Sequence, residues 1–189
     1  MQLVTPTAWI AARTGAVVPV RPPMIYVAHP VAAQAGEAIA TCTECDASHL
    51  FAPGDPLDLR LVCQHDAPIR NSSDPAAIVA FNCARALRWW RWLHLGLPDV
   101  TWVMPWYVNV IANGEADPVL IERGLRDDCE VARRCDALMA CGPRISSGMR
   151  REAIAAAEVG NELFQIVGVH REPPVSWGAT STPWQRWAT

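Results

Sequence analysis

The stretch RDDCEVARRCDALMACGPRISSGMRREAIAAAEVG, residues 126–160, decides the fold of this chain. It contains the end of an amphipathic helix, a short apolar run at 136–141 and an alanine-rich helix expected over 147–160. A buried strand between two helices is typical of α/β proteins, in which such strands form a parallel sheet. We therefore expect residues 126–160 to form part of an α/β domain.

The same alternation continues towards both ends of the chain. Further strands are expected at 24–31, 100–106 and 163–169. Asp74-Pro75 and Asp117-Pro118 each combine an N-cap residue with a first-turn proline, which predicts the starts of two further helices. The alternating order predicts a doubly wound, Rossmann- or flavodoxin-like parallel sheet with helices on both faces. Ligands of such sheets bind at the carboxyl ends of the strands, beside helix N-termini.

Composition divides the chain into regions. Residues 1–23 are rich in proline and threonine and predict an irregular leader, residues 24–170 predict the α/β domain, and residues 171–189 form a tryptophan-rich tail without periodicity. Within the domain, residues 33–73 are polar, which indicates an inserted loop or mini-domain after the first strand.

The bulk numbers exclude several classes of protein. With 189 residues, 51% of them hydrophobic, the chain suits one domain with a small appendage. A net charge of −3 argues against non-specific nucleic-acid binding. No run approaches the ~18 apolar residues of a membrane span, so we expect no membrane partner. Without an export signal, seven cysteines indicate reduced thiols, a cytoplasmic location and metal binding ahead of disulfides.

Four residues of the insert have the spacing of a metal site. Cys42 and Cys45 form C-x2-C, and after a 17-residue gap Cys63 and His65 form C-x-H. Two such pairs predict a zinc-ribbon-like site with a structural zinc ion, because four protein ligands leave no open position. His49 is an alternative fourth ligand, and a loop with incidental thiols is the alternative to a metal site.

Two acids lie on apolar faces of the expected helices. Glu152 shares a face with neighbouring apolar residues of its helix, and Asp128 does so on the preceding helix, although Asp127 could be the inward acid instead. Carboxylates among apolar side chains are costly unless they are paired or used. Their presence beside a helix N-terminus suggests chemistry on an anionic, sugar-like ligand, and a paired structural role is the alternative.

The turn before the second of these helices has the residues of an anion pocket. Ser146 offers a hydroxyl at the helix N-terminus, Arg144 a positive charge, and Gly148 room for a ligand to approach the backbone. Simple helix capping by Ser146 is the alternative.

The run RALRWWRWLHLG, residues 85–96, predicts an amphipathic helix rather than a nucleic-acid patch. Its spacing directs Trp90 and Leu93 inward and Arg85 away from that face. The aromatic excess favours a homo-oligomer.

These motifs together resemble a known family. IYVAHP contains Tyr26, Asp136 follows Asp128 by eight residues, and Ser146 precedes Glu152 by six. The pattern is similar to the nucleoside 2-deoxyribosyltransferase superfamily over residues 24–31 and 75–168. This superfamily includes the 2′-deoxynucleoside 5′-monophosphate N-glycosidases. The run RGLRDDxxVxxRCD…SSGMxxE is most similar to the corresponding run in a small branch of this superfamily that is common in phages and actinobacteria.

The resemblance implies cleavage of an N-glycosidic bond in a small-molecule nucleotide or nucleoside. Glu152 would attack the anomeric carbon, and Asp128 would protonate the leaving base. Ser146 stands where the nucleotide hydrolases bind the 5′-phosphate, which favours hydrolysis of a nucleoside 5′-monophosphate. Tyr26 would be a pocket wall or a core residue, and His29 replaces a usual glycine and would contact or block the pocket. A base-exchanging transferase and a non-catalytic nucleotide-binding module are the alternatives, and the family's subunit-shared sites again imply a homo-oligomer.

Overall fold

The computed structural model describes residues 3–4, 22–55, 58–114, 116–142, 144–166, 173 and 184–187. The chain forms two compact units, the first made of Met1–Pro30 and Arg85–Thr189 and the second of Val31–Ala84. Most of the expected leader and tail, and residues 167–169 of the last expected strand, lie outside the described residues.

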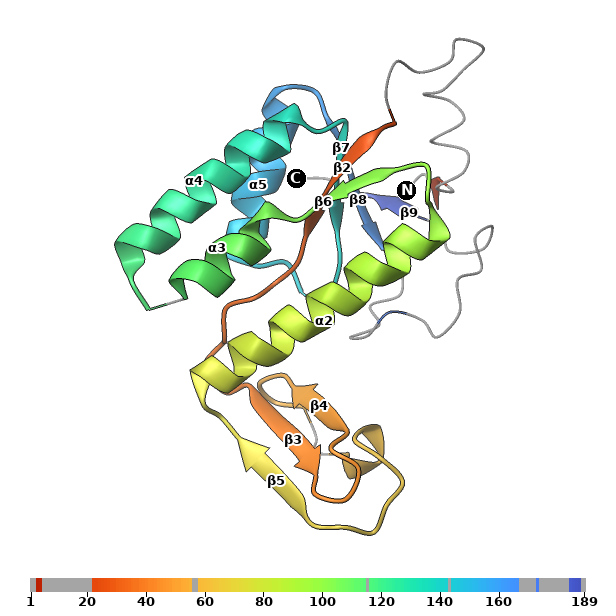
Figure 1. The fold of residues 1–189 in the computed structure, drawn as a ribbon, viewed down its shortest axis with the longest axis vertical. Coiled ribbons are helices and arrows are strands. Elements are labelled where there is room, and N and C mark those ends of the chain that lie inside the picture. The colour runs from red at the N-terminus through yellow and green to blue at the C-terminus, as the bar shows by residue number, and fades with distance from the viewer. Residues whose placement is uncertain are drawn as a thin grey trace. The chain divides into compact units, whose positions relative to one another are not determined.

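The first unit contains a six-stranded sheet (Figure 1). Four parallel strands lie side by side in the order β6-β2-β7-β8. Their bounds are Thr101–Val103 for β6, Met24–Ala28 for β2, Ala137–Ala140 for β7 and Glu162–Ile166 for β8. At the β8 edge, β9 (Trp184–Arg186) and β1 (Leu3–Val4) continue the sheet in antiparallel pairings. The expected parallel sheet is thus confirmed.

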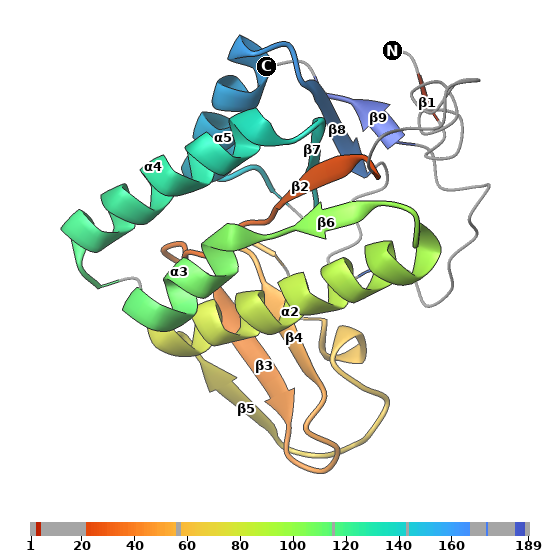
Figure 2. The same ribbon diagram turned by 45° about the horizontal axis from the view of Figure 1, so that its top comes forward.

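Among the described residues, four helices belong wholly or partly to this unit. They are α2 (Pro75–Gly96, from Arg85 onward), α3 (Pro105–Asn113), α4 (Pro118–Arg134) and α5 (Ser147–Glu158). The alternation of side chains along β2 separates two faces, since Ile25 and Val27 join a core cluster with Trp89 of α2, whereas Tyr26 reaches Glu152 of α5. Helices α4 and α5 lie together beside the sheet (Figure 2).

The helix starts follow from local chemistry. Asp117 caps α4 by accepting hydrogen bonds from the backbone nitrogens of Val119 and Leu120 at 2.8 and 3.4 Å. Ser146 caps α5 by accepting one from the nitrogen of Met149 at 3.2 Å. Both caps satisfy donors that the first helical turn leaves without intrahelical partners.

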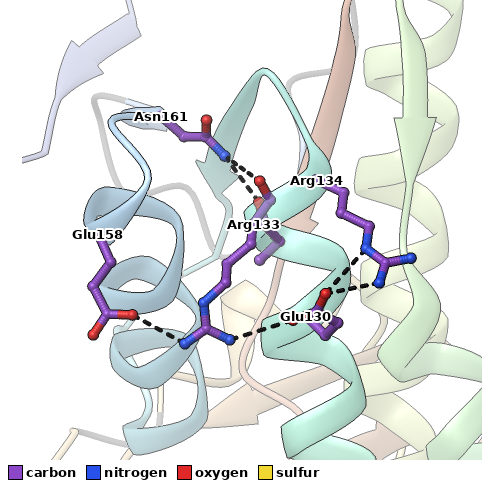
Figure 3. A network of polar contacts seen from close by, with 6 residues as sticks. Glu130, Arg133, Arg134, Glu158 and Asn161 are labelled. Atoms are coloured by element: carbon purple, nitrogen blue, oxygen red, sulfur yellow. Dashed lines mark hydrogen bonds and ion pairs between the residues drawn. The ribbon is translucent and has the colours of Figure 1, made fainter.

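Ion pairs join α4 to α5 near both ends of their contact. Arg151 and Glu122 form a two-pronged pair at 2.7 Å. At the other end Arg133 binds Glu158 at 3.0 Å, and Asn161 donates to the last carbonyls of α4 (Figure 3). Exposed pairs of this kind contribute little to stability.

Several expectations about boundaries and faces are wrong. The strand expected at 100–106 ends at Val103, because Pro105 begins a helix that the sequence analysis did not include. The spacing in α2 predicts that Trp90 is directed into the core. In the structure Trp89 is buried in the core, and Trp90 is only partly buried. Arg85 is 2% exposed, not directed away from the buried face.

The second unit is built around a three-stranded antiparallel sheet of order β4-β3-β5. Its strands are β3 (Ala38–Cys42), β4 (Ser48–Phe51) and β5 (Ile69–Ser72), with a short 3-10 helix, η1 (Leu59–Leu61), between β4 and β5. The expected insert therefore contains a separate sheet, although its core is small. No helix in the described ranges has the length and apolarity needed to cross a bilayer.

Candidate functional site

Glu152 is buried on the face of the sheet that α5 covers. It lies in the second turn of α5, is 5% exposed and accepts a hydrogen bond from the Tyr26 hydroxyl at 3.0 Å. Its other oxygen, Oε2, is buried and has no hydrogen-bond partner among the described residues. A buried carboxyl oxygen without a partner is costly in a folded protein. It is therefore the atom to expect in contact with a ligand.

Asp128 of α4 lies on the same side of the sheet. It is 4% exposed, and its Oδ1 accepts a hydrogen bond from Nδ2 of Asn109 on α3 at 3.1 Å. Asp127, the alternative inward acid, is exposed. Burial raises the pKa of both Glu152 and Tyr26 most, and the charge of Asp128 raises it further, so the three side chains lie within electrostatic reach of one another.

Burial raises the pKa of both acids. The pKa of Glu152 rises to about 8, chiefly through desolvation and also through the charge of Asp128, while the Tyr26 hydrogen bond opposes the rise. The pKa of Asp128 rises to about 7, again chiefly through desolvation, with the Asn109 hydrogen bond opposing it and the charge of Asp127 adding to it. Near neutral pH such a coupled pair retains a proton, so it can offer an acid and a carboxylate together.

The proposed anion-binding residues lie at the start of α5. The Ser146 oxygen caps the helix, which matches the structural alternative, yet the hydroxyl hydrogen can still be donated to a ligand. A Cβ on Gly148 would make only ordinary contacts, the nearest with Leu125 at 3.6 Å, so packing does not require glycine there. Arg144 is partly buried, and its charge lowers the pKa of His29.

His29 directly follows β2 and is 4% exposed. Desolvation and the charge of Arg85 lower its pKa well below the usual value, so the imidazole is neutral at physiological pH. Neither ring nitrogen of His29 has a well-formed hydrogen bond to the described residues, although the Pro30 backbone raises the pKa of His29 and so opposes the shift. The ring lies parallel to Trp106, with 6.4 Å between centroids.

Gly142, which follows β7, makes room for His29. Its φ is +105°, and a Cβ there would lie 3.1 Å from Nε2 of His29. The sequence predicts His29 at the site, but neither Gly142 nor Asn109. Asn109 lies on a helix that the sequence pattern does not predict, although Pro105 is a typical signal for a helix start.

The second unit brings together the four residues expected to bind metal. One ligand atom from each of Cys42, Cys45, Cys63 and His65 lies within 4.8 Å of the others. Cys42 ends β3, Cys45 follows in the turn, and the other two precede β5. His49, the alternative ligand, is not in this group and packs edge-on against Phe51.

The environment of Cys42 favours the thiolate that a metal needs. Backbone amides of Cys45 and Glu44 donate to its sulfur and, as the largest causes, lower its pKa to about 6. Three thiols and one imidazole make a soft, closed donor set that fits tetrahedral Zn²⁺. Zinc would therefore be held here as a structural ion.

Comparison of the chain with models of known protein families, with curated proteins and with solved structures finds no match. The chemistry of the site therefore rests on its own geometry.

Proposed function

We propose that this protein cleaves the N-glycosidic bond of a nucleoside 5′-monophosphate through a covalent intermediate on Glu152. The observation that supports this most is the buried pair of Glu152 and Asp128, each held by one neutral hydrogen-bond donor. A retaining glycosidase likewise uses two carboxyl groups, an ionised one that attacks the sugar and one with a raised pKa that transfers protons.

The reaction proceeds in two steps. First, a Glu152 oxygen bonds to the anomeric carbon, the electron pair of the C–N bond leaves with the base, and the proton of Asp128 passes to that base. Water then attacks the same carbon, Asp128 accepts a proton from it, and the Glu152 carboxylate is released. The reactive form of the pair holds one proton, on Asp128. Because the pKa of Glu152 is the higher of the two, this is the minor of the two singly protonated forms, and Glu152 is mostly neutral before the substrate binds.

The turn before α5 supports a phosphate as the anionic group. The Ser146 hydroxyl and the free amides of a helix N-terminus favour an anion, and the Arg144 side chain adds positive charge. These residues follow β7, while His29 follows the adjacent strand β2. Strand β2 has β6 on one side and β7, followed by β8, on the other. This strand order supports a doubly wound, Rossmann-like fold, whose ligand would bind at the carboxyl ends of β2 and β7.

Base release from deoxynucleoside and ribonucleoside 5′-monophosphates tests this proposal. Chromatography should detect free base with wild type, none above background with Glu152→Gln or Asp128→Asn, and full release with the control Glu158→Gln on the exposed side of the same helix. Nucleotide binding without release by wild type would instead favour the non-catalytic module.

Two further reactions separate the remaining alternatives. Addition of a second free base would yield a new nucleotide only if the enzyme is a transferase. Ser146→Ala should lower kcat/KM for the nucleotide more than for the matching nucleoside, because only the nucleotide carries the phosphate. Equal losses would contradict a phosphate contact at Ser146.

We also propose that the second unit holds a structural zinc ion on Cys42, Cys45, Cys63 and His65. Elemental analysis after purification with zinc present should give about one equivalent per chain, Cys63→Ser should lose it, and Cys83→Ala, a thiol outside the cluster, should keep it. Less than about a tenth of an equivalent in wild type would contradict a zinc site.

A further inference from the structure

We propose that Asn109 is a positioning residue that determines which oxygen of Asp128 carries the proton given to the leaving base. This inference rests on the proposed function for its catalytic meaning, but the geometry that supports it is independent of that function. The contact is the 3.1 Å hydrogen bond from Nδ2 of Asn109 to Oδ1 of Asp128.

Helix α3 holds Asn109 in a fixed place. Trp106, three residues earlier and on the same face, is 5% exposed and donates from its indole nitrogen to the Val27 carbonyl at 2.8 Å. The neighbouring Val108 and Ile111 are 66% and 63% exposed, so the inward face of α3 is the one with Trp106 and Asn109. The indole therefore ties α3 to β2, and this fixes the distance from Asn109 to the site.

Gly124 allows α3 and α4 to approach at this point. A Cβ on Gly124 would lie 3.4 Å from Cβ, Cγ and Nδ2 of Asn109. A methyl group would still fit there, but a larger side chain would occupy the space of the Asn109 amide. The glycine one turn before Asp128 thus gives the amide its access to the carboxyl group.

The hydrogen bond has two chemical consequences. An N–H donor stabilises the ionised carboxylate and lowers its pKa, which opposes the rise caused by burial. It also engages Oδ1 as an acceptor, so the neutral acid carries its hydrogen on Oδ2. Without the amide, Asp128 would hold its proton more tightly and on either oxygen, and protonation of the leaving base would be less well directed.

Other titratable groups lie close to Asp128. The charge of Asp127 on its own helix raises the pKa of Asp128 further, after burial has raised it most. The charge of Asp128 in turn adds to the rise in pKa that burial causes at Cys129 on its own helix, Tyr26 on β2 and Glu152 on α5. Among the described residues of α3, Asn109 is the one with a hydrogen bond to Asp128. A change at position 109 therefore tests the α3 contribution separately from the others.

The test is a carbon-13 NMR titration of the Asp128 carboxyl group in the full chain. Asn109→Ala should raise the pKa of Asp128 by about 1, as expected for a lost hydrogen bond to a charged group. Asn109→Asp keeps the shape but replaces the donor with a like charge, and should raise it further. Asn113→Ala, at the exposed end of the same helix, is the control and should leave it unchanged.

The same variants give a catalytic readout. In base release, Asn109→Ala should lower kcat at least tenfold and move the limb of the pH profile that follows the Asp128 pKa upward by about one pH unit, which loss of packing alone would not do. An unchanged or lowered pKa of Asp128 in Asn109→Ala would overturn the proposal. If the pKa rises as expected but wild type releases no base, the hydrogen-bond assignment stands and the proposed function fails.

Discussion

Replacement of Glu152 by glutamine should change the pH dependence of stability in a way that can be worked out from its burial. The pKa of Glu152 rises from an ordinary 4.5 to about 8 in the folded chain. Between these values the folded state holds a proton that the unfolded chain has released. The free energy of unfolding therefore falls as pH rises through this window, and it is level again above the folded pKa.

The size of the fall follows from the same two values. At about 1.4 kcal/mol for each pH unit, the interval corresponds to about 5 kcal/mol of stability lost between pH 4.5 and pH 8. Glutamine does not titrate and keeps an oxygen that can accept from Tyr26. Glu152→Gln should thus match wild type within about 1 kcal/mol near pH 4.5 and exceed it by several kcal/mol at pH 9.

Urea unfolding followed by tryptophan fluorescence can measure this difference. All nine tryptophans belong to the first unit, so the signal reports on the unit that contains the site. Glu158→Gln on the same helix is the control, and should change stability by less than about 1 kcal/mol throughout, because Glu158 is exposed. Parallel pH curves for wild type and Glu152→Gln would refute the assignment of a buried, neutral Glu152.

Three further substitutions test contacts in the site and the cap of α4. Tyr26→Phe removes the donor to Oε1 of Glu152 and should raise the pKa of Glu152 above about 8; a lower value in a carboxyl NMR titration would contradict the assigned hydrogen bond. Gly142→Ala should cost about 1–3 kcal/mol in urea unfolding, because φ is +105° and the new methyl would press on His29; an unchanged midpoint would show that this turn is not strained. Asp117→Ala removes the cap of α4 and should cost about 1 kcal/mol, and no loss would mean that the cap contributes nothing.

The parallel sheet could be predicted because its signals are local. Short apolar runs and the Asp-Pro pairs at helix starts gave the order of β2, α2, α4, β7 and α5. The interruption at Pro105 was missed since TWVMPW is apolar throughout, and only the lack of a proline N–H separates strand from helix there. Antiparallel edge strands β1 and β9 come from distant parts of the chain, and short segments of this kind have no distinctive pattern.

The site shows the same division between local and long-range information. The inward positions of Asp128 and Glu152 follow from helical spacing with neighbouring apolar residues. Their partners Tyr26 and Asn109 lie 126 and 19 residues away in sequence, so the sequence placed one partner only through the resemblance and missed the other. The burial of Arg85 depends on the packing of α2 in three dimensions, which helical spacing alone could not reveal.

Mass spectrometry of the protein quenched during reaction with a deoxynucleoside 5′-monophosphate tests the central claim most directly. A covalent intermediate on Glu152 predicts that the peptide containing this residue gains the mass of the bound sugar phosphate. No other peptide should gain this mass, in wild type or in Asp128→Asn. Base release without any such adduct, or an adduct on another side chain, would contradict the role of Glu152 as the nucleophile.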